Sequence, residues 1–365
     1  MLGLAGLAFA ACSNDDEVSN FDNGEKQSVV IKIDTANGEL TRALGPSVDD
    51  QNGQKIQLND VTIFFATEGG NVVKTTSIDG KQTENWSKLT GTGYIEHNVP
   101  TSVKKVFVVG NKEAFLNVNM AQIATQEELK TKAIAAATQT DITKLALYGE
   151  GSTLEEVQPQ VDHGHKTTTF TTTATLAPLM SRIEISGIQC KDLGNQYTSI
   201  DLKAIGLMNV AQKSNLKKDH LENLTLANVV EPGQSGDFVF GSTDFWAWDE
   251  ITGVSFKNSN DIHPTIALPN AKQDVYGYNF FATNENDLQV KLYVAAKQGE
   301  ITNPVNNTVT ASFSKTTFEP GKIYKVTLAF NEKNIGPWNP DLVQCIEVKV
   351  EVAEWKIETL TPEYQ

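Results

Sequence analysis

Short apolar runs, each bounded by polar and turn-forming residues, recur along most of the chain. In the first half they include SVVIKI (28–33), DVTIFFAT (60–67) and VKKVFVVGN (103–111), the last ending on a Gly-Asn turn signal. Runs of this length, rich in Val, Ile and Phe, are typical of β-strands. The pattern therefore predicts a mainly β protein.

One segment departs from this pattern. Residues 120–137 (MAQIATQEELKTKAIAAA) are rich in Ala, Glu, Lys and Leu and contain neither Gly nor Pro. Such a composition favours a helix. We therefore expect one clear helix in the first half of the chain.

The strand pattern breaks at Pro178 and resumes with SRIEISGIQC (181–190). Further predicted strands follow at 202–210, 237–241, 265–269, 275–283, 290–296, 322–330 and 345–357. Many short strands joined by Gly-, Asn- and Asp-rich connections indicate β-sandwiches. We expect two β-sandwich domains, residues 43–179 with the helix and residues 180–365.

The last predicted strand alternates most sharply. Its apolar residues alternate with charged ones. The apolar residues are Ile346, Val348, Val350 and Val352, and the charged ones between them are Glu347, Lys349 and Glu351. Alternation of this kind places one face of a strand in a core and the other in water. Two interpretations stay open: the strand is an edge of its own sandwich, or it is exchanged with a neighbouring molecule.

The beginning of the chain resembles an export signal. Residues 1–12, MLGLAGLAFAAC, are small and apolar, too short to span a bilayer, and end in Ala10-Ala11-Cys12. This pattern predicts a lipoprotein signal peptide, with Cys12 as the lipidated first residue of the mature protein. An ordinary secretory leader with an incidental cysteine is the alternative. Acyl chains such as palmitate would tether the protein to a membrane without making it span one.

The net charge excludes one class of partner, and the positions of the arginines suggest a site of proteolysis. The 365 residues carry 30 Lys and Arg against 45 Asp and Glu, a net charge of −15, which repels nucleic acid and excludes it as an expected partner. The arginines are Arg42 and Arg182. Arg42 lies in the polar stretch GELTRALGP (38–46), where we expect access for a protease. Arg182 falls within a predicted strand, which should protect it.

The sequence contains few candidates for a catalytic site, a metal site or a disulfide. The chain has no Gly-x-Ser-x-Gly, phosphate-loop, His-Glu-x-x-His or Cys-x-x-Cys motif, so we expect neither an enzyme nor a cofactor. His163 and His165 would share one face of a strand, but no further ligands stand nearby, so no metal site is expected. Cys190 and Cys345 lie in strand-like contexts and are expected as buried free thiols, with a disulfide as the alternative.

Two tryptophans raise a separate possibility. Trp246 and Trp248 in FWAWDE (245–250) alternate with Ala247, so on a strand both indoles would lie on one face. Core packing or a subunit contact is the favoured interpretation, because aromatic side chains mostly bury. Stacking against a sugar ring is the alternative.

Several segments together resemble the fimbrillins, the major fimbrial subunits of Bacteroidales that build type V pili. They are the leader with its acidic SNDDE (13–17), LTRALGPSVDDQNGQKIQLNDVTIFF (40–65), SRIEISGI (181–188), GLMNVAQKSNL (206–216), IHPTIALP (262–269), GKIYKVTLAF (321–330) and VEVAEWKI (350–357). The resemblance implies two transthyretin-like β-sandwiches, the first carrying a helix.

The resemblance also implies a maturation step. An Arg-specific protease would cut between Arg42 and Ala43 and remove residues 13–42 with a first strand. The apolar residues of that strand are Val29, Val30, Ile31 and Ile33. The C-terminal segment of the next subunit would refill the groove with Ile346, Val348, Val350, Val352, Trp355 and Ile357.

The implied function is that of a structural pilus subunit in a cell-surface fimbria, supporting adhesion and biofilm formation. The precursor would be an outer-membrane lipoprotein held through Cys12. Expected partners are copies of itself, other pilus subunits, the protease, and host surface proteins or glycans. Two alternatives stay open: a tip or anchor subunit of the same pilus, and a lipid-anchored glycan-binding module that uses Trp246 and Trp248.

Overall fold

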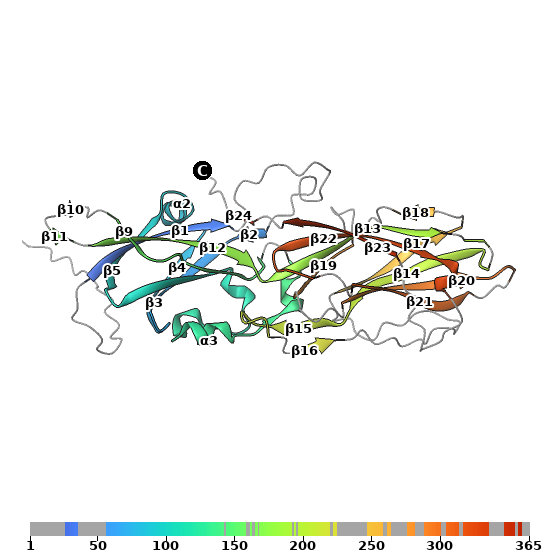
Figure 1. Cartoon of the computed structure of the whole chain (residues 1–365), viewed down its shortest axis with the longest axis horizontal. Helices are drawn as coiled ribbons and strands as arrows, with labels where there is room; N and C mark the ends of the chain where they lie inside the picture. Colours follow the sequence, from blue (N-terminus) through green and yellow to red (C-terminus); the bar gives the residue numbers. More distant parts are fainter. Residues whose placement is uncertain are drawn as a thin grey trace, which may run out of the picture.

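Two β-sandwiches follow one another along an elongated molecule in the computed structural model (Figure 1). The structure describes residues 26–35, 56–141, 144–157, 161–162, 165–166, 168–191, 193–194, 196–219, 222–224, 247–257, 261–263, 276–281, 288–300, 304–313, 317–335, 347–354 and 357–359. The mainly β class and the two sandwiches predicted from the many short strands are confirmed.

The N-terminal sandwich contains short helices as well as strands. Its elements are β1 (Lys26–Thr35), β2 (Ile56–Leu58), β3 (Asp60–Thr67), β4 (Val72–Asp79), α2 (Thr83–Leu89), β5 (Tyr94–Pro100), β6 (Val103–Gly110), η1 (Lys112–Ala114), η2 (Met120–Gln122), α3 (Gln126–Lys130), β7 (Ile134–Ala135), η3 (Ala136–Gln139), β8 (Leu147–Glu150), β9 (Glu155–Val157), β10 (Val161–Asp162), β11 (His165–Lys166) and β12 (Thr169–Pro178). Its main sheet has the order β4-β3-β6-β8-β12-β1-β5, and β9 pairs with β12.

Strand β12 joins the two layers of this sandwich. It pairs with β8 at Ala177 and Pro178 and with β1 from Thr169 to Leu176. Val, Ile and Phe side chains from both layers fill the space between them, and the rings of Phe64 and Phe107 stack with centroids 4.8 Å apart. The alternating strands of the sequence therefore bury one continuous apolar core.

The C-terminal sandwich is built almost entirely from strands. Its elements are β13 (Met180–Lys191), β14 (Ser199–Met208), β15 (Val210–Ser214), β16 (Glu222–Leu224), β17 (Trp248–Phe256), β18 (Asp261–His263), β19 (Tyr276–Phe281), β20 (Gln289–Lys297), β21 (Val305–Ser312), β22 (Lys322–Asn331), η5 (Glu332–Asn334) and β23 (Glu347–Glu354). The last strand, β24 (Ile357–Thr359), pairs with β2 of the N-terminal sandwich. One sheet has the order β18-β13-β22-β23 with β19 paired to β13, and the other β17-β14-β20-β21. A second core lies between them.

The helix expected over 120–137 is wrong as a single element. The structure has η2, the five-residue α3, β7 and η3 in its place. Thr125 has an extended backbone, and its side chain accepts a hydrogen bond from the backbone amide of Glu128. Thr125 is therefore the N-cap at which α3 begins. Beyond α3, Ile134 pairs with Ser214 of the C-terminal sandwich. Tertiary contacts of this kind override helix propensity, which is a weak preference.

A helix that the sequence did not suggest, α2, precedes β5. Its Trp86 is fully buried, and Lys88 forms an ion pair with Glu84 at 2.7 Å across one turn. Strands β17 and β21 were also missed. The strands expected at 237–241 and 265–269 lie outside the described residues.

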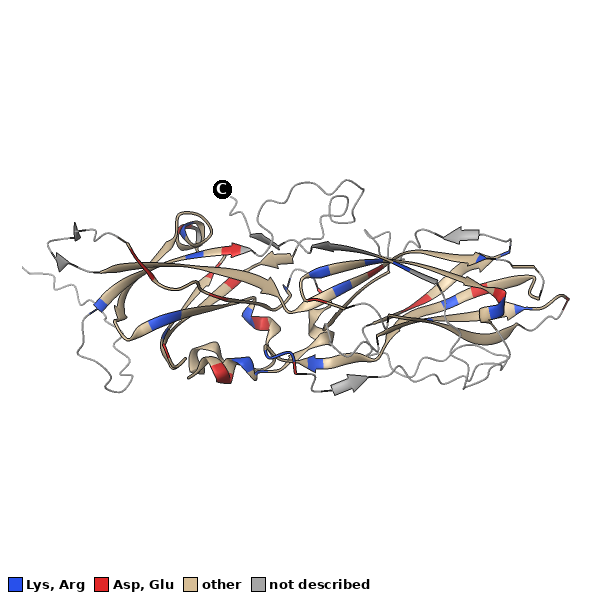
Figure 2. Cartoon of the chain, viewed as in Figure 1, with Lys and Arg blue, Asp and Glu red and all other residues tan. Residues whose placement is uncertain are grey.

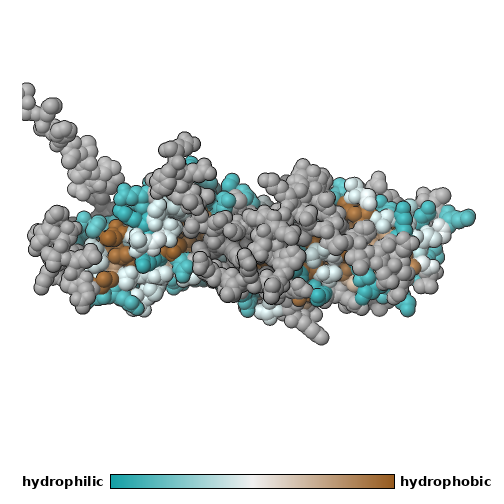
Figure 3. All heavy atoms as spheres, turned by 90° about the horizontal axis from the view of Figure 1, so that it is seen from above, coloured by the Kyte–Doolittle hydropathy of each residue, from teal (hydrophilic) through white to brown (hydrophobic). Residues whose placement is uncertain are grey.

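Charged residues of both signs are interspersed along the described parts of both sandwiches (Figure 2). Apolar surface is visible on the N-terminal sandwich when the molecule is seen from above (Figure 3). Ile95 on β5 is an exposed apolar residue of the N-terminal sandwich, and it lies opposite Val30 of β1.

Candidate functional site around strand β1

Strand β1 lies between two other strands and is not an edge. It pairs in parallel with β12, from Ser28 opposite Thr169 to Thr35 opposite Leu176, and antiparallel with β5. Both of its backbone edges are therefore hydrogen-bonded. Removing β1 would leave a gap one strand wide between β12 and β5 (Figure 1).

The four apolar residues predicted from the sequence lie together on this strand. Val29 and Ile31 are fully buried, Ile33 is nearly so, and Val30 faces outward and is half-buried. Each fully buried Val or Ile stabilises the fold by about 1.5–3 kcal/mol relative to leaving it in water. The inward face of β1 is thus part of the core of the N-terminal sandwich.

Polar contacts hold the beginning of β1 in register. The side-chain amide of Gln27 donates to the carbonyls of Pro100 and Val103, at 3.2 and 3.3 Å. The hydroxyl of Ser28 lies 3.2 Å from Nδ1 of His97, where the ladder between β1 and β5 has a bulge. These contacts join β1 to β5 and to the first residue of β6.

The turn before β5 passes close to the outer face of β1. Gly93 has a φ of +112°, and a Cβ at this position would lie 2.6 Å from Cγ1 of Val30. Only glycine adopts this conformation without strain and leaves room for Val30. Glycine at position 93 therefore allows the turn to pack closely against Val30 of β1.

A polar cluster that sequence reasoning missed ties β5 to β4. The ammonium of Lys74 lies 2.8 Å from Oε1 of Glu96, and the hydroxyls of Thr76 and Tyr94 donate to Oε2 at 2.8 and 3.0 Å. Burial and the Glu96 carboxylate raise the pKa of Tyr94 to about 12. No local pattern in YIEHNVP (94–100) marks Glu96 as inward, because its alternate neighbours Tyr94 and Asn98 are themselves polar.

The residues predicted to be processed or lipidated lie outside the described residues. Strand β1 ends at Thr35 and β2 begins at Ile56, so Arg42 and Ala43 fall between them. Cys12 precedes β1. Cleavage and lipidation therefore stay predictions.

The predicted donor segment pairs within its own chain. Strand β23 is antiparallel to β22, with Val348 opposite Leu328 and Val350 opposite Val326. Val352, on the same strand, lies opposite Tyr324. Val350 is half-buried against the C-terminal core.

The end of the same segment reaches the N-terminal sandwich. Ile357, in β24, pairs in parallel with Ile56 of β2. Ile346 and Trp355 lie outside the described residues. The exchange of this segment between subunits stays a prediction.

Arg182 is protected, as expected from its strand. Its side chain is 4% exposed, and its Nε donates to Glu184 at 2.7 Å while Nη1 donates to Asn279 at 3.1 Å. A protease needs an extended and exposed segment, so the bond after Arg182 is shielded in the folded protein.

The remaining candidates give no site in the described part of the chain. Cys190 is fully buried, whereas Cys345 and His163 lie outside the described residues. The described residues contain no cluster of three or more potential metal ligands. Trp248 is half-buried at the start of β17, and Trp246 lies outside the described residues.

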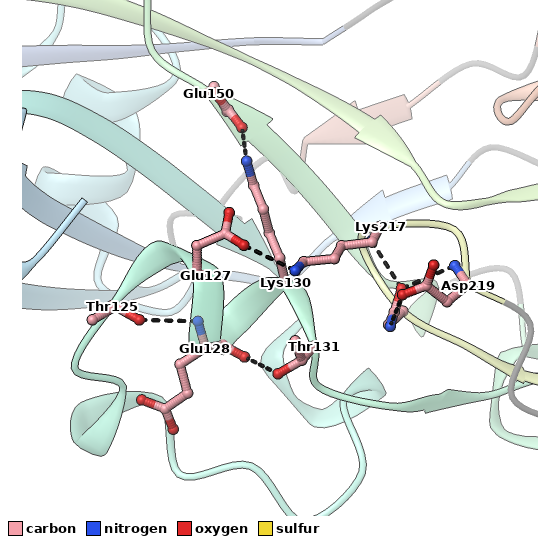
Figure 4. A network of polar contacts seen from close by, with 9 residues as sticks. Thr125, Glu127, Glu128, Lys130, Thr131, Glu150, Lys217 and Asp219 are labelled. Atoms are coloured by element: carbon pink, nitrogen blue, oxygen red, sulfur yellow. Dashed lines mark hydrogen bonds and ion pairs between the residues drawn. The ribbon is translucent and has the colours of Figure 1, made fainter. Parts of the chain in front are cut away.

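The two sandwiches contact each other through strands and side chains. Strands β7 and β15 pair across the junction, and the Asn279 amide donates to the carbonyl of Gln139 at 2.7 Å. Lys217, in the turn after β15, lies 2.9 Å from Glu127 of α3, while Lys130 pairs with Glu150 (Figure 4).

Comparison of the amino-acid sequence with known proteins finds no match. No protein-family model matches the chain, and no curated protein matches it in sequence. Among the described residues, no helix has the length and apolar character needed to cross a membrane.

Solved structures, by contrast, match along nearly the whole chain. A candidate cell adhesion protein of Bacteroides eggerthii matches with a TM-score of 0.60 at 20% identity, over 94% of this chain and 100% of that one. A second one, from Parabacteroides distasonis, matches with a TM-score of 0.56 at 14% identity, over 92% and 98%. The tip fimbrial protein Mfa3 of Porphyromonas gingivalis has a TM-score of 0.43 at 11% identity, over 90% and 100%. The first two matches establish a shared fold.

Proposed function

We propose that this chain is a fimbrillin-type pilus subunit that polymerises by strand exchange after proteolytic removal of β1. It would be exported as a lipoprotein on Cys12, matured by an Arg-specific protease at the Arg42–Ala43 bond, and assembled into a surface fimbria that supports adhesion and biofilm formation. The observation that carries the proposal is the position of β1, which precedes Arg42 and lies between β12 and β5. The fold shared with candidate cell adhesion proteins supports a role at the cell surface.

Cleavage would change the way β1 is held without changing its contacts. In the precursor, the covalent link keeps β1 at a high effective concentration beside its groove. After cleavage, β1 is a separate peptide held by its ladder and by Val29, Ile31 and Ile33. Its departure would expose an apolar groove flanked by unpaired N–H and C=O groups, a template for strand addition.

The C-terminal segment has the pattern that such a groove requires. Val348, Val350 and Val352 alternate with charged residues, as inward-facing positions of a replacement strand must. Among the described strands, β23 pairs with β22 alone, at one end of its sheet. A strand held along one edge can leave with fewer broken ladder bonds than a central strand.

Limited proteolysis of the full chain tests this function. Wild type treated with an Arg-specific protease should yield a product beginning at Ala43, lose β1, and form ladders that resist mild SDS. Arg42→Lys keeps the positive charge but removes the cleavage site, so it should stay monomeric. Polymerisation of Arg42→Lys at the wild-type rate would reject the proposal. Wild-type protein that stays monomeric after complete cleavage and loss of β1 would reject it as well.

A further inference from the structure

The two walls of the proposed groove are held in different ways. Strand β12 pairs with β8 and β9 as well as with β1, and Ala174 forms a further bridge to Gly151. Among the described strands, β5 pairs with β1 alone. Loss of β1 would therefore remove the whole described backbone ladder of β5, whereas β12 would keep its pairing with β8 and β9 and the bridge to Gly151.

Strand β5 is also held to β4, through side-chain contacts of Glu96. Glu96 is 11% exposed and receives the ammonium of Lys74 at 2.8 Å and the hydroxyl of Thr76 at 2.8 Å. Lys74 also donates to the carbonyl of His97 at 2.9 Å. Lys74 and Thr76 belong to β4, and Tyr94 and His97 to β5 itself. These polar contacts of the Glu96 cluster therefore involve no atom of β1.

The cluster joins the two ends of the sheet order. The order begins with β4 and ends with β5, so Glu96 connects strands that have no ladder between them. Charge-assisted hydrogen bonds in a partly buried position are stronger and more directional than neutral ones. The cluster therefore restrains β5 from the side opposite to the groove.

We propose that Glu96, through Lys74 and Thr76, positions β5 as the second wall of the acceptor groove once β1 has left. This inference rests on the proposed function. Without the restraint, β5 would move toward β12, because two adjacent unpaired strand edges with apolar side chains between them attract each other. The groove would then close before another strand could enter. Glu96 is a positioning residue that determines whether the emptied subunit can accept a strand.

Rebinding of the removed strand measures this directly. The full chain is cleaved with an Arg-specific protease, separated from β1 in mild denaturant, and titrated with a fluorescent synthetic peptide of residues 26–35. We expect Lys74→Met and Glu96→Ala to bind the peptide at least tenfold more weakly than wild type. Lys74→Arg retains the ion pair and should bind like wild type. Glu68→Gln, which removes the exposed pair with Lys105, is the matched control.

A second measurement separates positioning from general stability. Hydrogen exchange of residues 94–100 should be the same in intact wild type and intact Lys74→Met, because β1 holds β5 in both. After removal of β1, exchange should accelerate at least tenfold more in Lys74→Met than in wild type. Similar acceleration before cleavage would indicate an ordinary stability effect and would reject the inference.

The outcomes also distinguish the inference from the function on which it rests. If wild type binds the peptide and both cluster variants bind it equally well, the positioning role is wrong and the proposed function survives. If wild type itself cannot release or rebind β1, both fall together.

Discussion

Asn279 of the C-terminal sandwich donates its side-chain amide to the backbone carbonyl of Gln139 in the N-terminal sandwich, with 2.7 Å between nitrogen and oxygen. Both residues are buried, and Asn279 also accepts a hydrogen bond from Nη1 of Arg182 at 3.1 Å. Gln139 in turn accepts from the amide of Ala146 through its side chain. A buried polar chain thus connects the two sandwiches.

Truncation of Asn279 should weaken this connection. Asn279→Ala leaves the Gln139 carbonyl and an Arg182 N–H without these partners, and an unsatisfied buried polar group costs about 1–3 kcal/mol. Urea unfolding should show this loss and separate into two transitions. Lys217→Ala removes the exposed contact with Glu127 across the same junction and should leave the unfolding midpoint unchanged. A single transition at the wild-type midpoint for Asn279→Ala would contradict the prediction.

A side chain at position 93 should loosen β1. Gly93→Ala combines a positive φ with a Cβ only 2.6 Å from Val30, and strain and overpacking each cost about 1–3 kcal/mol. Gly194→Ala is the matched control, since Gly194 has a φ of +120° and nothing within 4 Å of the added carbon. Hydrogen exchange of β1 should accelerate in Gly93→Ala alone. Equal exchange of β1 in the two variants would show that the contact with Val30 is unimportant.

The inward face of β1 should matter much more than its outer face. Ile31→Ala empties a fully buried site and should cost about 2–5 kcal/mol. Val30→Ala, one residue away and half-buried, should cost about 1 kcal/mol or less. Urea unfolding of the intact chain gives both values, and after cleavage at Arg42 the Ile31→Ala protein should release β1 first. Equal costs would place Ile31 outside the core.

A half-buried carboxylate should make stability depend on pH. Burial raises the pKa of Asp249 above its ordinary value of 3.8, although the Tyr278 hydroxyl, which donates to it at 2.6 Å, opposes the shift. The folded state therefore holds the proton more tightly, and its stability falls as pH rises from about 3.8 through the raised pKa. Each pKa unit of this shift costs about 1.4 kcal/mol at neutral pH.

Asp249→Asn tests that dependence. The amide still accepts from Tyr278 but carries no charge, so urea unfolding should show higher stability than wild type at pH 7 and a smaller difference at pH below 3.8. Tyr278→Phe removes the donor that lowers the pKa and should steepen the pH dependence. Parallel pH curves for wild type and Asp249→Asn would refute the assignment.

Local patterns were sufficient for many of the longer strands, among them β1, the strand proposed to be removed. The apolar run SVVIKI predicted a strand, and the structure has β1 there with Val29, Ile31 and Ile33 buried. Apolar periodicity reflects which face of a strand leaves water, and the chain carries that information residue by residue. The protection of Arg182 followed from the same reasoning.

Pairing between distant segments decided the rest. Nothing local indicates that β1 lies between β12 and β5, that Glu96 meets Lys74, or that Ile134 leaves a helical composition to pair with Ser214. These contacts join residues far apart in sequence, and their free energy comes from shared burial and hydrogen bonding that exist only after the layers have assembled. Period and composition determined which residues face inward, whereas tertiary packing determined which strands become neighbours and therefore where a groove can open.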